Sequence, residues 1–184
     1  MKFKKFAVIS AVIVAFLAVG IVLCGLKPAD IKQRAAELQE YCVKHGYNSD
    51  YAILVDLGRF SFQRRLYVYD LKNDKIVMAS LSGHGSGGNS TIFTADFSNV
   101  NGSHCSSLGH YKIGVERMMY SRHALAYELD GLDKTNSNAR SRSILVHSSA
   151  WPLSLGCVTL PFGRYDKLSE FLKTQKNVIM WVYN

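Results

Sequence analysis

An uncharged, apolar run near the start of the chain constrains its architecture more than any other feature. Residues 6–26 hold 21 consecutive residues without a charged side chain, and Lys2, Lys4 and Lys5 precede them. A helix of that length, at about 1.5 Å per residue, spans the hydrocarbon core of a bilayer. The lysines favour a cytoplasmic N-terminus, so the rest of the chain is expected outside the cytoplasm. We therefore expect residues 1–26 to form a signal anchor, followed by about one domain.

The end of this run bears on whether the segment is retained. The run is long for the apolar part of a signal peptide, and it lacks a clear small-x-small cleavage site. Residues 21–24 resemble a lipobox, but Leu23 is large where that motif has a small residue before its cysteine, here Cys24. An uncleaved anchor is therefore our prediction. Export by a cleaved signal sequence, or lipidation of Cys24, is the alternative.

The charge balance narrows the partners. The formal net charge is +8, and without the three leading lysines it is 8 − 3 = +5. A basic excess of this size suits an anionic wall or membrane surface. No run of Lys and Arg interleaved with aromatic residues is present, so we expect no nucleic-acid partner. Beyond the run, Cys42, Cys105 and Cys157 give an odd number of thiols, which fits one disulfide plus a free thiol or three free thiols.

Apolar periodicity separates a helical linker from a mostly β domain. Ile31, Ala35, Leu38 and Cys42 recur at helical spacing, which predicts a helix within residues 27–50 that Gly46 can end, with Cys42 as a core residue. From residue 51 to residue 184 the pattern is mostly β, and Asp130-Gly131 marks a turn. Strands are predicted over residues 51–57, 66–71, 76–81, 111–115, 124–129, 143–147 and 178–183, with a short helix around 165–172.

Residues 82–109 break this pattern. Eighteen of these 28 residues are Gly, Ser, Asn or His, and loops of this length in a compact domain are usually functional or disordered. The loop begins with Ser-Gly-His-Gly-Ser-Gly-Gly, which superficially resembles a phosphate-binding loop, but the GK[ST] ending and a following apolar helix are missing. We expect the loop to form a wall of a substrate cleft, with His84 pointing inward; the alternative is a flexible surface loop.

The same loop raises the question of a metal. His104, Cys105 and His110 could ligate zinc together with His84 or His123. The spacing fits no familiar zinc frame and contains no CxxC pair, so we expect no metal. Cys105 is then either buried or bridged to Cys42.

The sharpest combination of reactive residues follows in the chain. His147 ends a predicted strand, and Ser154-x-Gly156-Cys157 comes after a short loop. A thiol becomes a strong nucleophile once a nearby imidazole takes its proton. Gly156 allows positive φ or a close backbone approach, so that N–H groups there can face a developing oxyanion. The alternative is a buried structural cysteine and a histidine at a strand end.

Three segments together resemble a known family. They are residues 82–88, residues 97–109, and residues 132–147 followed by Ser154-x-Gly156-Cys157. With the hairpin at residues 65–73, they resemble the murein L,D-transpeptidase catalytic-domain family, a divergent branch of the YkuD-like L,D-transpeptidases. The resemblance covers residues 51–184. It implies a mostly β catalytic domain, a mixed β-sandwich or barrel with a few short helices, and no metal or organic cofactor.

The resemblance also implies a reaction and a location. A cysteine attacks a carbonyl of a peptidoglycan stem peptide and forms a thioester, which an amine of a neighbouring stem or water then resolves. The enzyme would work in the periplasm or on the outer face of the inner membrane. By position, Cys157 is the nucleophile and His147 the general base. The substrate and oxyanion positions are Gly156 with Cys157, Ser154, His84 and Ser107.

Two departures from the family pattern keep other functions open. Leu153 and Val158 stand where the family has Arg and Pro, and the stretch from His147 to Cys157 is shorter than the family's. An L,D-carboxypeptidase or cysteine peptidase would use the same thioester with water as acceptor. A degenerate domain that binds peptidoglycan without catalysis is the third alternative.

Overall fold

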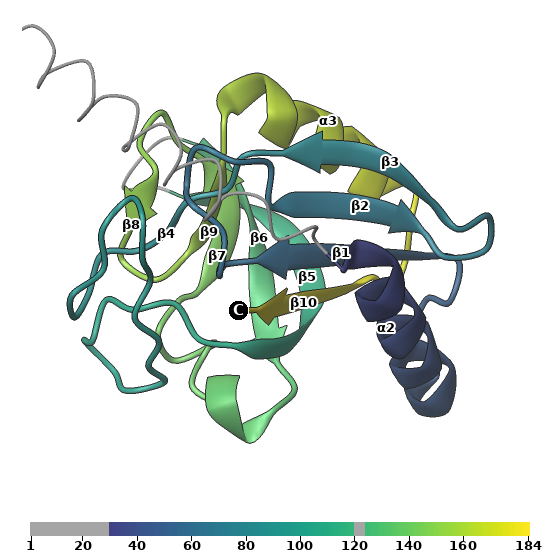
Figure 1. Ribbon diagram of the computed structural model, residues 1–184, viewed down its shortest axis with the longest axis horizontal. Helices are drawn as coiled ribbons and strands as arrows, with labels where there is room; N and C mark the ends of the chain where they lie inside the picture. Colours follow the sequence, from purple (N-terminus) through teal and green to yellow (C-terminus); the bar gives the residue numbers. More distant parts are fainter. Residues whose placement is uncertain (1–29, 120–123) are drawn as a thin grey trace, which may run out of the picture.

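The computed structural model describes residues 30–119 and 124–184, which form a mostly β fold with two α-helices (Figure 1). The predicted anchor at residues 6–26 lies outside the described residues. Within the described ranges, no helix combines the length and the apolar character needed to cross a membrane.

Eight strands form one mixed sheet in the order β3-β2-β1-β10-β5-β6-β7-β9. The β1–β10 and β7–β9 pairs are parallel, and the other neighbours are antiparallel. This large sheet is found in place of the expected sandwich or barrel. Its strands are β1 (Tyr51–Asp56), β2 (Leu66–Asp70), β3 (Lys75–Ser80), β5 (Gly109–Met119), β6 (Ala124–Gly131), β7 (Leu145–Ser148), β9 (Val158–Leu160) and β10 (Ile179–Tyr183).

Two helices cover parts of the sheet. In α2 (Ile31–His45), Ala35, Leu38 and Cys42 are buried at helical spacing, and Gly46 ends the helix at φ +71°, as the pattern predicts. They pack with one set of β1 and β2 side chains, whereas α3 (Phe162–Lys173) packs with the set that includes Ile53, Val55 and Val68. Because successive strand residues face opposite ways, the helices lie on opposite faces of the sheet.

The predicted turn at Asp130-Gly131 is wrong, because both residues belong to β6 and pair with β5. Gly131 is required for close packing rather than for a turn, since a Cβ there would collide with the carbonyl oxygen of Asn136. The Asp130 carboxylate forms an ion pair with Arg140. The glycine thus accommodates the short 3-10 helix Lys134–Asn136 against the strand end.

A second, two-stranded parallel sheet was not predicted from the sequence. It pairs β4 (His84–Gly85) with β8 (Leu153–Ser154) and so joins the glycine-rich loop to the segment before Cys157. Figure 1 shows β4 and β8 side by side, next to β9 and β7. Segments about 70 residues apart in the chain therefore meet beside the reactive histidine and cysteine of the sequence motif.

Candidate active site

His147 and Cys157 come from neighbouring strands at one edge of the sheet. His147 lies on β7 opposite Thr159 of β9, and Val146 lies opposite Val158. Both valines belong to the core, so alternation turns His147, and Cys157 just before β9, to the other face. The two side chains therefore lie on the same face of neighbouring chain segments.

The ring of His147 is fixed by its own strand. The side chain is only 3% exposed, and Nδ1 lies 2.8 Å from the carbonyl oxygen of Ser148. A carbonyl accepts only, so Nδ1 carries the proton and donates it in this bond. The lone pair of the neutral ring is then on Nε2, which is the tautomer suited to accept a proton from a thiol.

Cys157 is the most accessible of the three described thiols. It is partly exposed, whereas Cys42 and Cys105 are buried, and all three are unbridged. Burial raises the pKa of the Cys42 thiol to about 11. The Sγ of Cys157 lies 3.7 Å from the carbonyl oxygen of Ser143, a residue held at φ +51°. Since none of the three thiols is bridged, Cys105 is buried and forms no disulfide with Cys42.

The backbone before Cys157 is held by the Ser154 hydroxyl. Ser154 Oγ donates to the carbonyl oxygen of Cys157 at 2.7 Å and accepts from the N–H of Gly156 at 3.1 Å. Gly156 has φ +114°, which only glycine adopts easily. Its carbonyl accepts from Ser106 Oγ at 3.2 Å. Ser154 thus closes a small hydrogen-bonded ring with the backbone of Cys157, and the Gly156 N–H bonds this hydroxyl in the structure.

The glycine-rich segment packs tightly against neighbouring backbone. A Cβ at Gly85 or Gly87 would collide with carbonyl oxygens of the segment at His104 and Ser103, and one at Gly83 would collide with Thr159. Ser106 Oγ accepts from the Gly85 N–H at 2.9 Å. The glycines therefore permit close packing of three loops around the reactive segment. This explains the composition without a phosphate-binding role.

His84 lies within the wall of this region, at 1% exposure. Its Nδ1 accepts from Arg65 Nη2 at 2.7 Å, and Nε2 donates to the carbonyl oxygen of Thr94 at 3.2 Å. Arg65 is itself 1% exposed and donates to the carbonyl oxygens of Ser82 and Arg59. Burial, and then the charge of Arg65, lower the pKa of His84 to about 4. His84 thus connects Arg65 to the loop at Thr94 by hydrogen bonds. Its contact with a substrate stays a prediction.

Ser107 is also buried, and it leads to a residue that sequence reasoning missed. Its hydroxyl donates to the carbonyl oxygen of Ser98 and accepts from Arg142 Nη1 at 2.6 Å. The Arg142 guanidinium also donates to the carbonyl oxygens of Ser98 and Cys105, and a Cβ at Gly156 would lie 3.1 Å from its Nη2. A positive charge with neutral acceptors therefore lies one residue from Cys157. In the sequence, the one hint of such a cation is that Leu153 stands where the family has an arginine.

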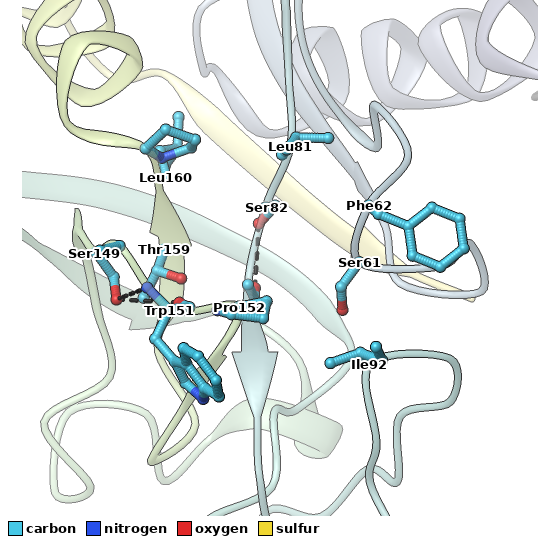
Figure 2. A pocket seen from close by; sticks show the side chains of 13 residues that line it. Ser61, Phe62, Leu81, Ser82, Ile92, Ser149, Trp151, Pro152, Thr159 and Leu160 are labelled. Atoms are coloured by element: carbon cyan, nitrogen blue, oxygen red, sulfur yellow. Dashed lines mark hydrogen bonds between the residues drawn. The ribbon is translucent and has the colours of Figure 1, made fainter.

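A cavity of about 240 Å³, cavity A, opens beside Thr159 at this edge of the sheet (Figure 2). Thr159 lines the cavity and also pairs with His147 in the β7–β9 register. Figure 2 shows Trp151 and Phe62 on two sides of the opening, with Pro152 and Ser82 between them. No charged side chain lines it. Its other lining residues are Ser61, Leu81, Gly83, Ile92, Ser149, Ala150, Leu160 and Pro161.

Two of the histidines that could have joined Cys105 at a metal, His84 and His110, are engaged elsewhere. His110 Nδ1 pairs with Asp133 at 2.9 Å, and its ring stacks on Tyr41. His123 lies outside the described residues. Across residues 30–119 and 124–184, no group of three or more potential ligands is close enough to hold a metal ion.

One protein family matches most of the chain. The sequence matches the L,D-transpeptidase catalytic domain family over residues 25–181. Among curated proteins, none matches the chain in sequence.

Several solved structures are similar at low identity. They include an L,D-transpeptidase from Xylanimonas cellulosilytica (13% identity, TM-score 0.47, covering 78% of this chain and 68% of that one). Another is an L,D-transpeptidase from Stackebrandtia nassauensis (15%, 0.46, 88% and 72%). A third is Bd1075 from Bdellovibrio bacteriovorus (19%, 0.49, 75% and 49%).

Proposed function

The chain belongs to the L,D-transpeptidase catalytic domain family, and we propose that it modifies peptidoglycan through a thioester on Cys157, with His147 as general base. The observation that carries this proposal is the β7–β9 register, which places His147 opposite Thr159; alternation continued by one residue before β9 puts the Cys157 side chain on the same face. Family membership alone supports a peptidoglycan-modifying enzyme that acts outside the cytoplasm. The register supports the choice of these two residues.

The proposed reaction begins with a proton transfer. His147 Nε2 takes the Cys157 proton, and the thiolate attacks a stem-peptide carbonyl carbon, so that a C–S bond forms and an oxyanion develops. When the C–N bond breaks, the imidazolium returns its proton to the leaving amine. An incoming amine or water then loses a proton to His147 and attacks the thioester, which releases the acyl group and restores the thiol.

The surrounding residues would support this chemistry in distinct ways. The backbone N–H of Cys157 is the proposed oxyanion donor, because that of Gly156 bonds the Ser154 hydroxyl, and Ser154 would hold the loop in shape by its two hydrogen bonds. Arg142 is proposed as a positioning residue, because its guanidinium donates to the segment at residues 98–107 and lies against Gly156. Its positive charge would also favour the Cys157 thiolate. Cavity A, which has a neutral lining, is the proposed place for an uncharged part of the peptide.

The test is acylation of the full-length protein by purified wall stem peptides, followed by intact mass and peptide mapping. We expect an acyl adduct on Cys157, and its loss in Cys157→Ser and in His147→Ala with unchanged circular dichroism. Since the two residues act as one unit, the double variant should be scarcely worse than either single variant.

The matched control is Cys105→Ser, which removes a neighbouring buried thiol and should acylate normally. An adduct mapped to Cys105, or parent-rate acylation by His147→Ala, would contradict the assignment. The released product then identifies the acceptor, since a cross-linked peptide requires an amine and a shortened free acid requires water.

A further inference from the structure

A second cavity, of about 370 Å³, lies between the β2–β3 hairpin and α3, and we name it the cationic cavity. Three of its lining residues are basic, namely Arg64, Arg164 and Lys167, and all three are exposed. None of its lining residues is acidic. In the part of the chain that the structure describes, none of the three basic side chains forms an ion pair. Their charge is therefore available to a ligand.

The rest of this lining is apolar. Val68 is buried, Met78 and Phe171 are partly buried against the main core, and Val77 is 52% exposed. On α3, Arg164 and Lys167 are three positions apart and so share one stripe of the helix surface. A cavity with basic groups and an apolar wall suits a ligand that carries carboxylates beside an aliphatic stretch.

The cationic cavity continues the surface of cavity A. Both cavities draw their lining from the same three segments, and the contributing residues are two or three positions apart. The pairs, with the cavity A residue first, are Leu81 and Ala79, Phe62 and Arg64, and Pro161 and Arg164. Two residues of a strand span about 6.6 Å. An extended peptide that fills cavity A would therefore reach the cationic cavity within two or three of its own residues.

We propose that the cationic cavity is a second peptide subsite, which binds free carboxylates of a stem peptide whose uncharged part fills cavity A. This proposal rests on the proposed function. Arginine side chains bind carboxylates through two parallel N–H···O bonds, and the lysine adds a third positive charge. The neutral lining of cavity A offers no charged partner to a carboxylate, so the two cavities sort the peptide by charge. The subsite selects an acidic peptide over its amidated form.

The test uses two matched stem peptides, one with free carboxylates and one with the same carboxylates amidated. Binding of each is measured by calorimetry to the full-length Cys157→Ala protein, which cannot form the thioester. The charge-reversed variant carries Arg164→Glu and Lys167→Glu, and a milder one carries Arg164→Gln and Lys167→Gln. Lys176→Glu is the control, because it reverses an exposed charge that lines neither cavity.

We expect charge reversal to raise the Kd of the free-acid peptide by about tenfold or more, and that of the amidated peptide by less than about twofold. The glutamine variant should lie between, and the control should match the parent. Equal losses for both peptides, or no loss for either, would overturn the subsite. If binding is charge-selective but the parent protein, with Cys157 intact, forms no acyl adduct, the proposed function alone would be rejected. If charge reversal leaves the rate of acylation by the free-acid peptide unchanged, the subsite alone would be rejected.

Discussion

The neutral state of His84 follows from its surroundings. The ring is almost fully buried, and Arg65, which is buried beside it, donates to Nδ1. Burial and then this neighbouring charge lower its pKa from the ordinary 6.5 to about 4. A histidine in this state accepts a hydrogen bond from Arg65 at neutral pH, and it resists the second proton that would break that bond.

This depressed pKa predicts acid sensitivity. Between about pH 6.5 and pH 4 the unfolded chain takes up a proton at His84 that the folded chain refuses, so stability falls as the pH falls through that window. His84→Gln keeps an acceptor for Arg65 but cannot titrate. From pH 7 to pH 5 the parent should lose about 2 kcal/mol more of its free energy of unfolding than the variant. Urea unfolding at both pH values measures this, and equal losses would contradict the role of His84.

At this scale the sequence indicates candidate reactive residues, whose roles stay a prediction, but not the residues that support them. Cys157, Gly156 and His147 occupy one short motif whose chemistry depends on residue type and order. Arg65 and Arg142 could not be predicted in the same way, because most of their acceptors are backbone carbonyls of distant loops. A backbone acceptor leaves no mark on the sequence.

At the scale of elements, Arg142 attaches the segment at residues 98–107 to the turn before β7, next to the loop that ends at Cys157. The guanidinium donates to the carbonyl oxygens of Ser98 and Cys105 and to Ser107 Oγ. Hydrogen bonds from a charged donor are stronger than neutral ones, and their loss removes this donor from the part-buried carbonyl oxygen of Cys105. Gly156 adjoins this guanidinium, so the position of the Cys157 backbone depends on it.

Arg142→Ala should therefore slow acylation of Cys157 by about tenfold or more, equivalent to roughly 1.4 kcal/mol. Arg142→Lys keeps the charge and should recover part of the rate. Arg140→Ala is the matched control, because Arg140 comes from the same turn but pairs with Glu128 and Asp130. Adduct formation followed by mass over a range of pH measures the effect. An unchanged pH profile in Arg142→Ala would exclude an electrostatic contribution from Arg142.

Strand prediction succeeded where alternation is long and failed where tertiary contacts decide. The strands β1, β2, β3 and β10 were predicted to within a residue or so, because each carries several apolar residues. The two-residue strands β4 and β8 are too short for any period to show, and they exist only because they pair with each other. The strand β5 extends to Met119 through residues that are partly or fully exposed, and Glu116 and Arg117 interrupt the apolar pattern of its far end.

For the whole molecule, the central strand comes from the C-terminus. β10 lies between β1 and β5, so residues 179–183 complete a sheet whose first strand begins at residue 51. A parallel β1–β10 pair has no hairpin signature, and neighbouring sequence does not predict it. Fold class followed from composition and periodicity, whereas strand order required the structure. The exposed C-terminal residue Asn184 nevertheless remains a suitable fusion point.

The location of the domain can be tested at that point. Residues 6–26 are uncharged and long enough, at about 1.5 Å per residue, to span a bilayer, and the lysines before them favour a cytoplasmic N-terminus. A reporter that is active only outside the cytoplasm, fused after Asn184, should therefore be active in cells and sediment with membranes. Deletion of residues 6–26 should abolish that activity and leave the fusion in the cytoplasm. Lys2→Glu, Lys4→Glu and Lys5→Glu together should reduce correct orientation, since positive residues hold the N-terminus inside. A reporter active without residues 6–26, or inactive with them while the fusion accumulates in the cytoplasm, would reject the anchor.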